Sequence, residues 1–231
     1  MLLCAALGAL PACSGASTTE SVAPTVAPST SPSTSPSLST TTKAAASPSS
    51  PSPTSSPTST AARAPAQPPV DPHDVFATTD RTRYTSPWFT EAWPVLNPFG
   101  CTTSPLYGSD PRCPGKQGFH HGTDIAMACG TTILAGIAGT VLAPDTPTRP
   151  GRSYGPTVFR IRTSDNAMDV LVAHAASVRV RPGQRVAVGE PIATAGSVGA
   201  PDGCQLHVEV RAAGGDVTTA VDPGPVLALS R

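Results

Sequence analysis

The sequence carries little charge and no excess of either sign. Only 13% of its 231 residues are charged, and 15 basic residues balance 15 acidic ones, so the formal net charge is zero. The basic residues form no cluster along the chain. Nucleic-acid binding needs a concentrated positive surface, and we therefore expect no nucleic-acid partner.

An apolar run long enough to span a bilayer is also lacking. Residues 1–13 are apolar over about a dozen positions, whereas a membrane-spanning helix needs roughly 20. A short apolar run at the N-terminus is typical of an export signal. Its end, Leu-Pro-Ala-Cys-Ser at 10–14, resembles a bacterial lipobox, which predicts an acylated Cys13 that anchors the chain to a membrane. A plain cleaved signal peptide is the alternative, and both interpretations place the protein outside the cytoplasm.

Residues 14–70 lack the side chains that could build a core. The segment consists almost entirely of Ser, Thr, Pro and Ala, and its charged residues are Glu20, Lys43 and Arg63. Such a composition cannot bury enough apolar surface to offset the entropy lost on ordering. We predict a long disordered linker, which as a proline-rich stalk could reach about 170 Å at ~3.1 Å per residue.

No convincing amphipathic helix is found after residue 99, where short β-rich runs are divided by Gly and Pro. The runs are 132–134, 139–142, 157–162, 168–174, 185–188, 191–195 and 204–211. Many short strands without helical crossovers predict an all-β, antiparallel sandwich or barrel-like domain over residues 99–231. Residues 71–98 contain Trp88 and Trp93 without clear periodicity. We expect that segment to dock on the domain, and its structure stays open.

The cysteines after the N-terminal segment do not form a C-x-x-C pair, which argues against a cysteine zinc site. Four of them remain there, an even number that predicts disulfides in an oxidising compartment. Three pairings are possible. We favour Cys101 with Cys113, which closes a Gly- and Pro-rich loop, and Cys129 with Cys204, which joins two distant segments beside candidate metal ligands.

Four of the five histidines fall in motif-like settings. The run Phe-His-His-Gly-Thr-Asp-Ile-Ala at 119–126 puts His120 and Asp124 four residues apart. An extended strand would hold them about 13 Å apart, whereas zinc holds each donor at about 2 Å. The chain must therefore fold back at Gly122 if both residues are ligands. His121 could be the ligand in place of His120.

Polar and apolar residues alternate near the C-terminus, in the run Gln-Leu-His-Val-Glu-Val at 205–210. A strand there would direct Gln205, His207 and Glu209 to one face and the apolar side chains to the other. His174 closes another apolar run, at 169–174. One face of the strand at 205–210 is thus expected to be core, and the other is expected to be a site.

In their order along the chain, these motifs resemble the lysostaphin/LytM-type peptidoglycan peptidases over about residues 95–211. The likeness rests on H-x-G-x-D at 120–124, a strand that ends in His174, the turn at 181–192, and x-L-H-x-E-V at 205–210. It implies a zinc metalloendopeptidase that cuts peptide bonds of peptidoglycan at the cell wall. The implied zinc ligands are His120, Asp124 and His207. His174 is the implied catalytic histidine that does not bind zinc.

One position departs from the family pattern. The final motif of the family is His-x-His with a catalytic first histidine, and this chain has Gln205 in that place. Glutamine does not titrate, and general acid–base help is worth about 10²–10⁴ in rate. We predict that His174 supplies proton transfer and that Gln205 holds water or substrate through hydrogen bonds. The alternative is a catalytically impaired module that binds peptidoglycan or regulates another cell-wall hydrolase.

The turn at 182–199 also resembles the hairpins of lipoyl and biotinyl carriers. Those carriers need a lysine at the hairpin tip, and the only lysines here are Lys43 and Lys116. We therefore discount a carrier function. The expected partners are peptidoglycan peptides and, through Cys13, a membrane.

Overall fold

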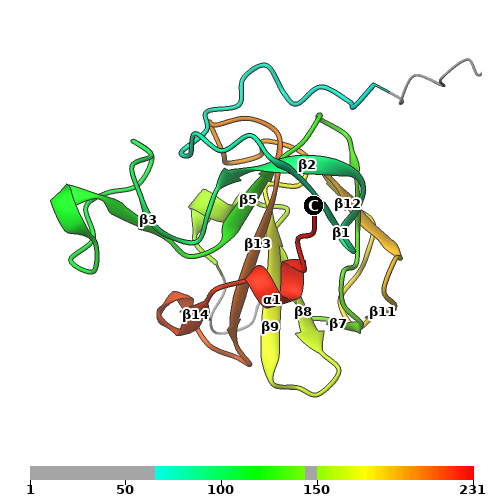
Figure 1. Cartoon of the computed structure of the whole chain (residues 1–231). Coiled ribbons are helices and arrows are strands. Elements are labelled where there is room, and N and C mark those ends of the chain that lie inside the picture. Colours follow the sequence, from blue (N-terminus) through cyan, green and yellow to red (C-terminus); the bar gives the residue numbers. More distant parts are fainter. Residues whose placement is uncertain (1–65, 144–149) are drawn as a thin grey trace, which may run out of the picture. The chain divides into compact units, whose positions relative to one another are not determined.

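The computed structural model describes residues 66–143 and 150–231 (Figure 1). They fall within one compact unit, Thr60–Arg231. The predicted signal segment, Cys13 and the linker up to residue 65 lie outside the described residues. Within the described ranges, no helix is long and apolar enough to cross a membrane.

Strands dominate the described part of the chain, which confirms the prediction of an all-β, antiparallel fold. The strands are β1 (Arg83–Ser86), β2 (Phe89–Asn97), β3 (Gly100–Thr102), β4 (Gly118–His120), β5 (Thr123–Ala126), β6 (Thr132–Leu134), β7 (Gly139–Val141), β8 (Phe159–Thr163), β9 (Met168–Ala173), β10 (Ser177–Val178), β11 (Arg185–Val186), β12 (Pro191–Thr194), β13 (Gln205–Ala212) and β14 (Ala220–Val221). The helical elements are η1 (Pro114–Lys116), η2 (Arg152–Tyr154), η3 (Val217–Thr219) and α1 (Gly224–Leu227).

The main sheet has the order β1-β2-β5-β13-β9-β8-β7-β11, and β14 also pairs with β13. The sheet curls, and a smaller sheet has the order β10-β12-β6. Strands β3 and β4 form a hairpin that extends to one side of the domain (Figure 1). Strands β5, β13 and β9 are neighbours in the main sheet, and they carry or adjoin the predicted site residues.

Residues 83–97, whose structure the sequence left open, form β1 and β2 at one edge of the main sheet. Trp88 and Trp93 lie in the hydrophobic core. Strand β2 pairs with β5, and the register shifts between Val95 and Asn97. Such a bulge interrupts the alternation of buried and exposed residues, so the sequence pattern did not indicate a strand here.

Strand β13 has the alternation expected from its sequence. Its apolar face joins the core cluster through Leu206, Val208 and Val210. Burying an aliphatic side chain of this size stabilises a domain by about 1.5–3 kcal/mol, so the core holds β13 in register. In that register, His207 lies opposite Asp124 of β5 and Ala173 of β9.

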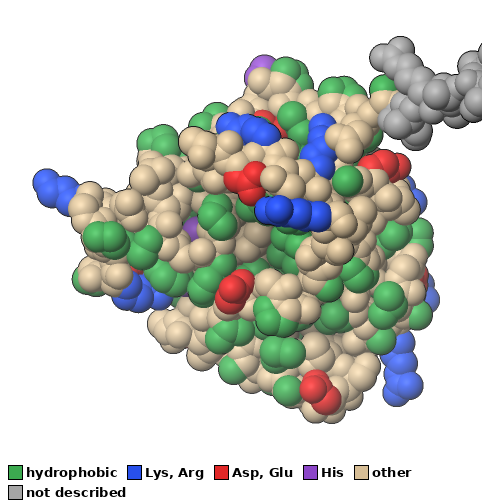
Figure 2. Space-filling view, viewed as in Figure 1, with side chains coloured by type: hydrophobic (Ala, Val, Ile, Leu, Met, Phe, Trp, Pro, Cys, Tyr) green, Lys and Arg blue, Asp and Glu red, His purple; other side chains and the backbone are tan. Residues whose placement is uncertain are grey.

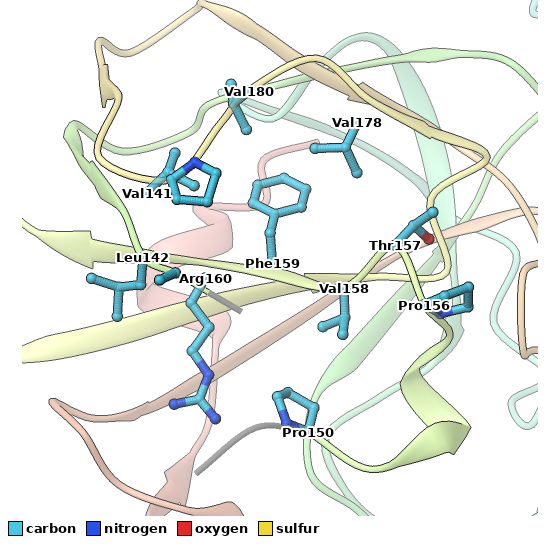
Figure 3. Close-up of a pocket in the computed structure, with 12 residues that line it drawn as sticks. Val141, Leu142, Pro150, Pro156, Thr157, Val158, Phe159, Arg160, Val178 and Val180 are labelled. Carbon is cyan, nitrogen blue, oxygen red and sulfur yellow. The ribbon is translucent and has the colours of Figure 1, made fainter. Parts of the chain in front are cut away.

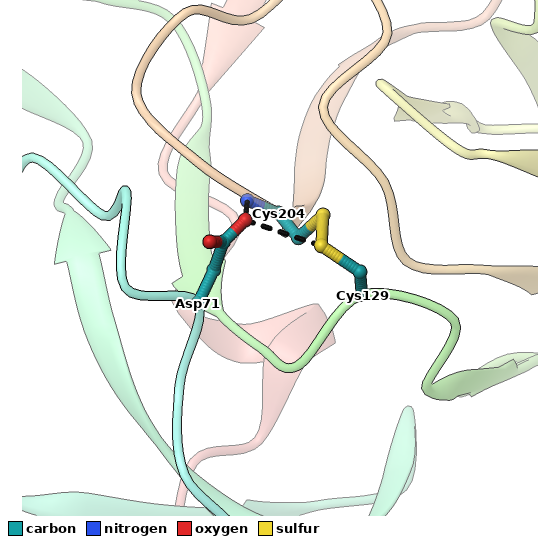
Figure 4. Close-up of side chains that lie close together, drawn as sticks. All are labelled: Asp71, Cys129 and Cys204. Carbon is teal, nitrogen blue, oxygen red and sulfur yellow. Dashed lines mark hydrogen bonds between the residues drawn. A yellow bond between two sulfur atoms is a disulfide. The ribbon is translucent and has the colours of Figure 1, made fainter.

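Two disulfides join loops around the site. Cys101 is bonded to Cys113, and Cys129 is bonded to Cys204, which directly precedes β13. Asp71 accepts a hydrogen bond from the backbone N–H of Cys204 at 2.9 Å and lies beside the second disulfide (Figure 4). Disulfide sulfurs offer no thiolate to a metal, so we interpret Asp71 as an attachment point of the N-terminal arm (residues 66–82) and not as a metal ligand.

Candidate metal centre

Three of the predicted site residues meet because of the strand pairing. His120 ends β4, and the chain bends at residues 121–122 before Asp124 enters β5. A Cβ atom on Gly122 would lie 2.6 Å from Cε1 of His207 and 2.6 Å from the carbonyl oxygen of Val208. A residue without a side chain is therefore required at the bend.

The ligand atoms of His120, Asp124 and His207 lie within 4.8 Å of one another, and all three side chains are buried. Nε2 of His120 lies 3.4 Å from Nδ1 of His207 and 3.4 Å from Oδ2 of Asp124. Nδ1 of His207 lies 2.7 Å from Oδ1 of Asp124. Donors at about 2.0–2.1 Å from a tetrahedral zinc ion stand roughly 3.3 Å from one another. The first two separations fit such an ion, and a small opening of the His207–Asp124 pair would fit the third.

The hydrogen bond of His120 leaves Nε2, the nitrogen that faces His207 and Asp124, available for a metal. Nδ1 of His120 lies 3.1 Å from the carbonyl oxygen of Pro98. A carbonyl only accepts, so Nδ1 carries the proton and Nε2 keeps its lone pair. Burial lowers the pKa of His120 and favours this neutral form.

Nε2 of His207 lies 3.6 Å from Oε2 of Glu209, and Nδ1 on the other side of the ring faces His120 and Asp124. Burial would lower the pKa of His207, but the carboxylates of Asp124 and Glu209 raise it to about 9. A metal ion would therefore displace a proton from His207.

A buried network supports Glu209 from behind. Arg211 donates from Nε to Oε1 of Glu209 at 2.5 Å, and the Tyr154 hydroxyl donates to Oε2 at 2.7 Å. Burial raises the pKa of Glu209, but the attraction of His207 and Arg211 outweighs it and lowers the value to about 2. Glu209 is thus ionised, and a carboxylate behind a ligating histidine fixes the orientation of its ring. Arg211 continues the polar face of β13, so the alternation could have identified it, whereas Tyr154 carried no signal.

His174 follows β9 and has a left-handed backbone conformation with φ 59°. Its Nδ1 lies 3.0 Å from the carbonyl oxygen of Val198, so Nδ1 donates and Nε2 is the free nitrogen. Its ring centroid is 5.5 Å from that of His207. Burial and the nearby His207 lower the pKa of His174 to about 4, so its ring is neutral at pH 7.

The remaining predicted residues lie around the ligand group. Gln205 is buried beside it, and its Nε2 donates to Oδ1 of Asp202 at 3.2 Å. His121 is not part of the group, because its Nε2 accepts from Arg112 at 2.9 Å. The structure therefore brings His120, and not His121, to Asp124 and His207.

Side chains of the candidate site line a cavity of about 280 Å³. Its lining includes His120, His121, His174, Gln205, His207, Tyr107, Tyr154 and Asp202. A second cavity, of about 310 Å³, is lined mostly by apolar side chains around Phe159 (Figure 3). The first cavity contains the groups that could carry chemistry. On the molecular face in Figure 2, Lys and Arg side chains are scattered among acidic and apolar ones.

Several solved structures are similar to this chain. The catalytic domain of the antimicrobial peptidase lysostaphin from Staphylococcus simulans is 25% identical, and the match covers 53% of this chain and 88% of that chain with a TM-score of 0.43. LytU is 26% identical over 59% of this chain and 86% of that chain, with a TM-score of 0.46. A zinc-containing peptidase from Vibrio cholerae is 23% identical over 62% and 39%, with a TM-score of 0.45.

No curated protein matches the chain. A family model does match, over residues 118–223, and its description is peptidase family M23. The matched range contains all three residues of the candidate ligand group and also His174 and Gln205. Residues 118–223 form a domain of peptidase family M23.

Proposed function

We propose that this domain is a zinc metalloendopeptidase that hydrolyses peptide bonds of bacterial peptidoglycan. The observation that carries the proposal is the buried group of His120, Asp124 and His207, whose two histidines line a cavity together with His174. Two neutral imidazoles and one carboxylate are a ligand set that catalytic zinc uses, with a further position for water or substrate. The membership of residues 118–223 in a peptidase family supports hydrolysis as the reaction.

Zinc in such a site lowers the pKa of water to about 7 and polarises a carbonyl group. His174 has a free Nε2 at the cavity and is the residue that moves the proton or stabilises the developing oxyanion. Gln205 does not titrate, and its role is to hold water or substrate by hydrogen bonding. Glu209 keeps the His207 ring in place.

The test is mass analysis of muropeptides from purified cell wall before and after treatment with the wild-type chain. We expect new cleavage products from wild type, none from His207→Ala, and wild-type products from the matched histidine variant His121→Ala. Unchanged muropeptides with a folded, zinc-loaded wild type would contradict the proposed activity.

Gln205 is the observation that favours a second candidate function, a catalytically impaired module that binds peptidoglycan or regulates another hydrolase. The discriminating variant is Gln205→His. A large gain in cleavage over a silent wild type would support the binding module, whereas clear wild-type cleavage that is lost in His207→Ala would support the enzyme.

We also propose that the domain works outside the cytoplasm, on a linker (residues 14–70) that a lipid at Cys13 anchors to a membrane. Metabolic labelling with a radioactive fatty acid tests the anchor. We expect label on the wild-type chain and none on Cys13→Ala, and an unlabelled wild type would support a secreted protein.

A further inference from the structure

The side-chain amide of Gln205 has a hydrogen-bond partner for its nitrogen and, among the described residues, none for its oxygen. Its side chain is 1% exposed, and Nε2 donates to Oδ1 of Asp202 at 3.2 Å. Its other polar atom, Oε1, is buried without a hydrogen-bond partner among the described residues. Leaving a buried acceptor unpaired is costly, so the unpaired oxygen indicates a ligand that enters the cavity.

The amide orientation follows from the charge of its partner. A carboxylate only accepts hydrogen bonds, so the alternative orientation would place Oε1 of Gln205 against an oxygen of Asp202. That arrangement is repulsive. Asp202 therefore keeps the NH₂ group on its own side and leaves Oε1 for another donor.

Asp202 is itself held firmly in a loop between β12 and β13. Its carbonyl oxygen accepts from the backbone N–H of Val75 in the N-terminal arm at 2.9 Å, and its side chain is 4% exposed. The charged groups that act on it are Asp124 of β5 and His207 of β13, and Asp74 of the arm interacts with it in turn. Burial and the charge of Asp124 raise the pKa of Asp202 to about 6, so it is mostly ionised at pH 7.

We propose that Asp202 is a positioning residue, which fixes the Gln205 amide so that Oε1 accepts a hydrogen bond from a donor of the reacting complex. The donor is either a peptide N–H of the substrate or the attacking water, and both present the same chemistry to Oε1. The inference rests on the proposed hydrolase function. Asp202 and Gln205 would together take the role of the catalytic histidine that the family pattern has at position 205.

Reversing the polarity of the pair tests this inference. In Gln205→Glu, two carboxylates would face each other, and we expect kcat/KM to fall about 100-fold, as for a small misplacement in an active site. In the double variant Asp202→Asn/Gln205→Glu, the new amide donates to one oxygen of the new carboxylate and leaves the other as an acceptor. We expect it to recover to within about tenfold of wild type, a coupling that independent sites do not show.

The kinetic parameters identify the donor. A loss of affinity, seen as a raised KM, assigns the bond to the substrate N–H, whereas a lowered kcat assigns it to the water. Zinc content should match wild type in all variants, and Asp222→Asn is the control for an exposed carboxylate. A Gln205→Glu variant with the kcat/KM of wild type, or a double variant with a kcat/KM no higher than that of Gln205→Glu, would overturn the inference.

A second readout needs no activity. We expect the side-chain NH₂ signals of Gln205 in ¹⁵N-resolved NMR to show one hydrogen-bonded proton in wild type and to lose that shift in Asp202→Ala, which removes the acceptor. Identical signals in the two proteins would overturn the pairing even where Gln205→Glu fails to fold. A wild type with the expected NMR signals but no cleavage would instead refute the proposed function, and with it the role of Oε1 in catalysis.

Discussion

Glu209→Gln is the substitution that most directly tests the buried network behind His207. It keeps the shape of the side chain and removes its charge. Oε1 and Oε2 of Glu209 accept from Arg211 and Tyr154, and the neutral amide would turn an NH₂ group toward one of these donors. Arg211 is 2% exposed and would lose its carboxylate partner.

The size of the effect follows from the pKa of Glu209. A fall from 4.5 to about 2 corresponds to about 3 kcal/mol of preferential stabilisation of the ionised form in the folded state. Breaking one partner of a buried ion pair typically costs 3–5 kcal/mol, which agrees. Because the folded-state pKa is lowered, this stability is present above pH 4.5 and is lost as the pH falls through 2.

The assay is urea denaturation of the metal-free domain at pH 7. We expect Glu209→Gln to lower the free energy of unfolding by about 3 kcal/mol, and the melting temperature by roughly 6–12 °C. Zinc affinity should fall about 10- to 100-fold. Glu91→Gln, at an exposed position of β2, is the matched control. A loss below about 0.5 kcal/mol, the range of ordinary surface substitutions, would refute the assignment of Glu209 as the support of His207.

Three further predictions concern other parts of the site. Gly122→Ala should destabilise the domain and weaken zinc binding, because its Cβ would lie 2.6 Å from the His207 ring. Thermal melting with and without zinc measures the stability and the zinc binding, and wild-type melting temperatures would contradict a clash with His207. His174→Phe should keep its zinc but lose about 10²–10⁴ in turnover, and full activity in muropeptide digestion would exclude proton transfer by His174. Replacing Cys129 and Cys204 by Ser should cost about 4 kcal/mol, and replacing Cys101 and Cys113 about 3 kcal/mol, since the closed loops differ in length; urea midpoints that rank the pairs in the opposite order would contradict this.

Local patterns in the sequence were enough to predict the β class, whereas the ligand residues were implied by the resemblance of the motifs to a peptidase family. Alternation over 205–210 indicated which side of a strand would be polar, and the structure has Leu206 and Val208 in the core and His207 near Asp124. This worked because successive side chains of a strand point to opposite faces, so the alternating residue types separate an apolar core face from a polar site face, although both faces of β13 are buried.

Features that depend on distant pairing could not be predicted in the same way. The pairings of β2 with β1 and with β5 each contain a register shift, so the alternation is lost. Asp202 reaches the site from a loop and Tyr154 from the short helix η2, and nothing in their local sequence signals a partner on β13. The choice between His120 and His121 likewise depended on which ring the bend at Gly122 turns toward His207.

The proposed activity depends most on one zinc ion shared by two imidazoles and a carboxylate. Equilibrium dialysis against zinc, followed by elemental analysis, measures this directly on wild type and on His120→Ala, Asp124→Ala, His207→Ala and His121→Ala. We expect one tightly bound zinc ion per chain in wild type and in His121→Ala, and loss of tight binding in the other three. Equal zinc content in all five proteins, or none in a folded wild type, would contradict a zinc site built from His120, Asp124 and His207.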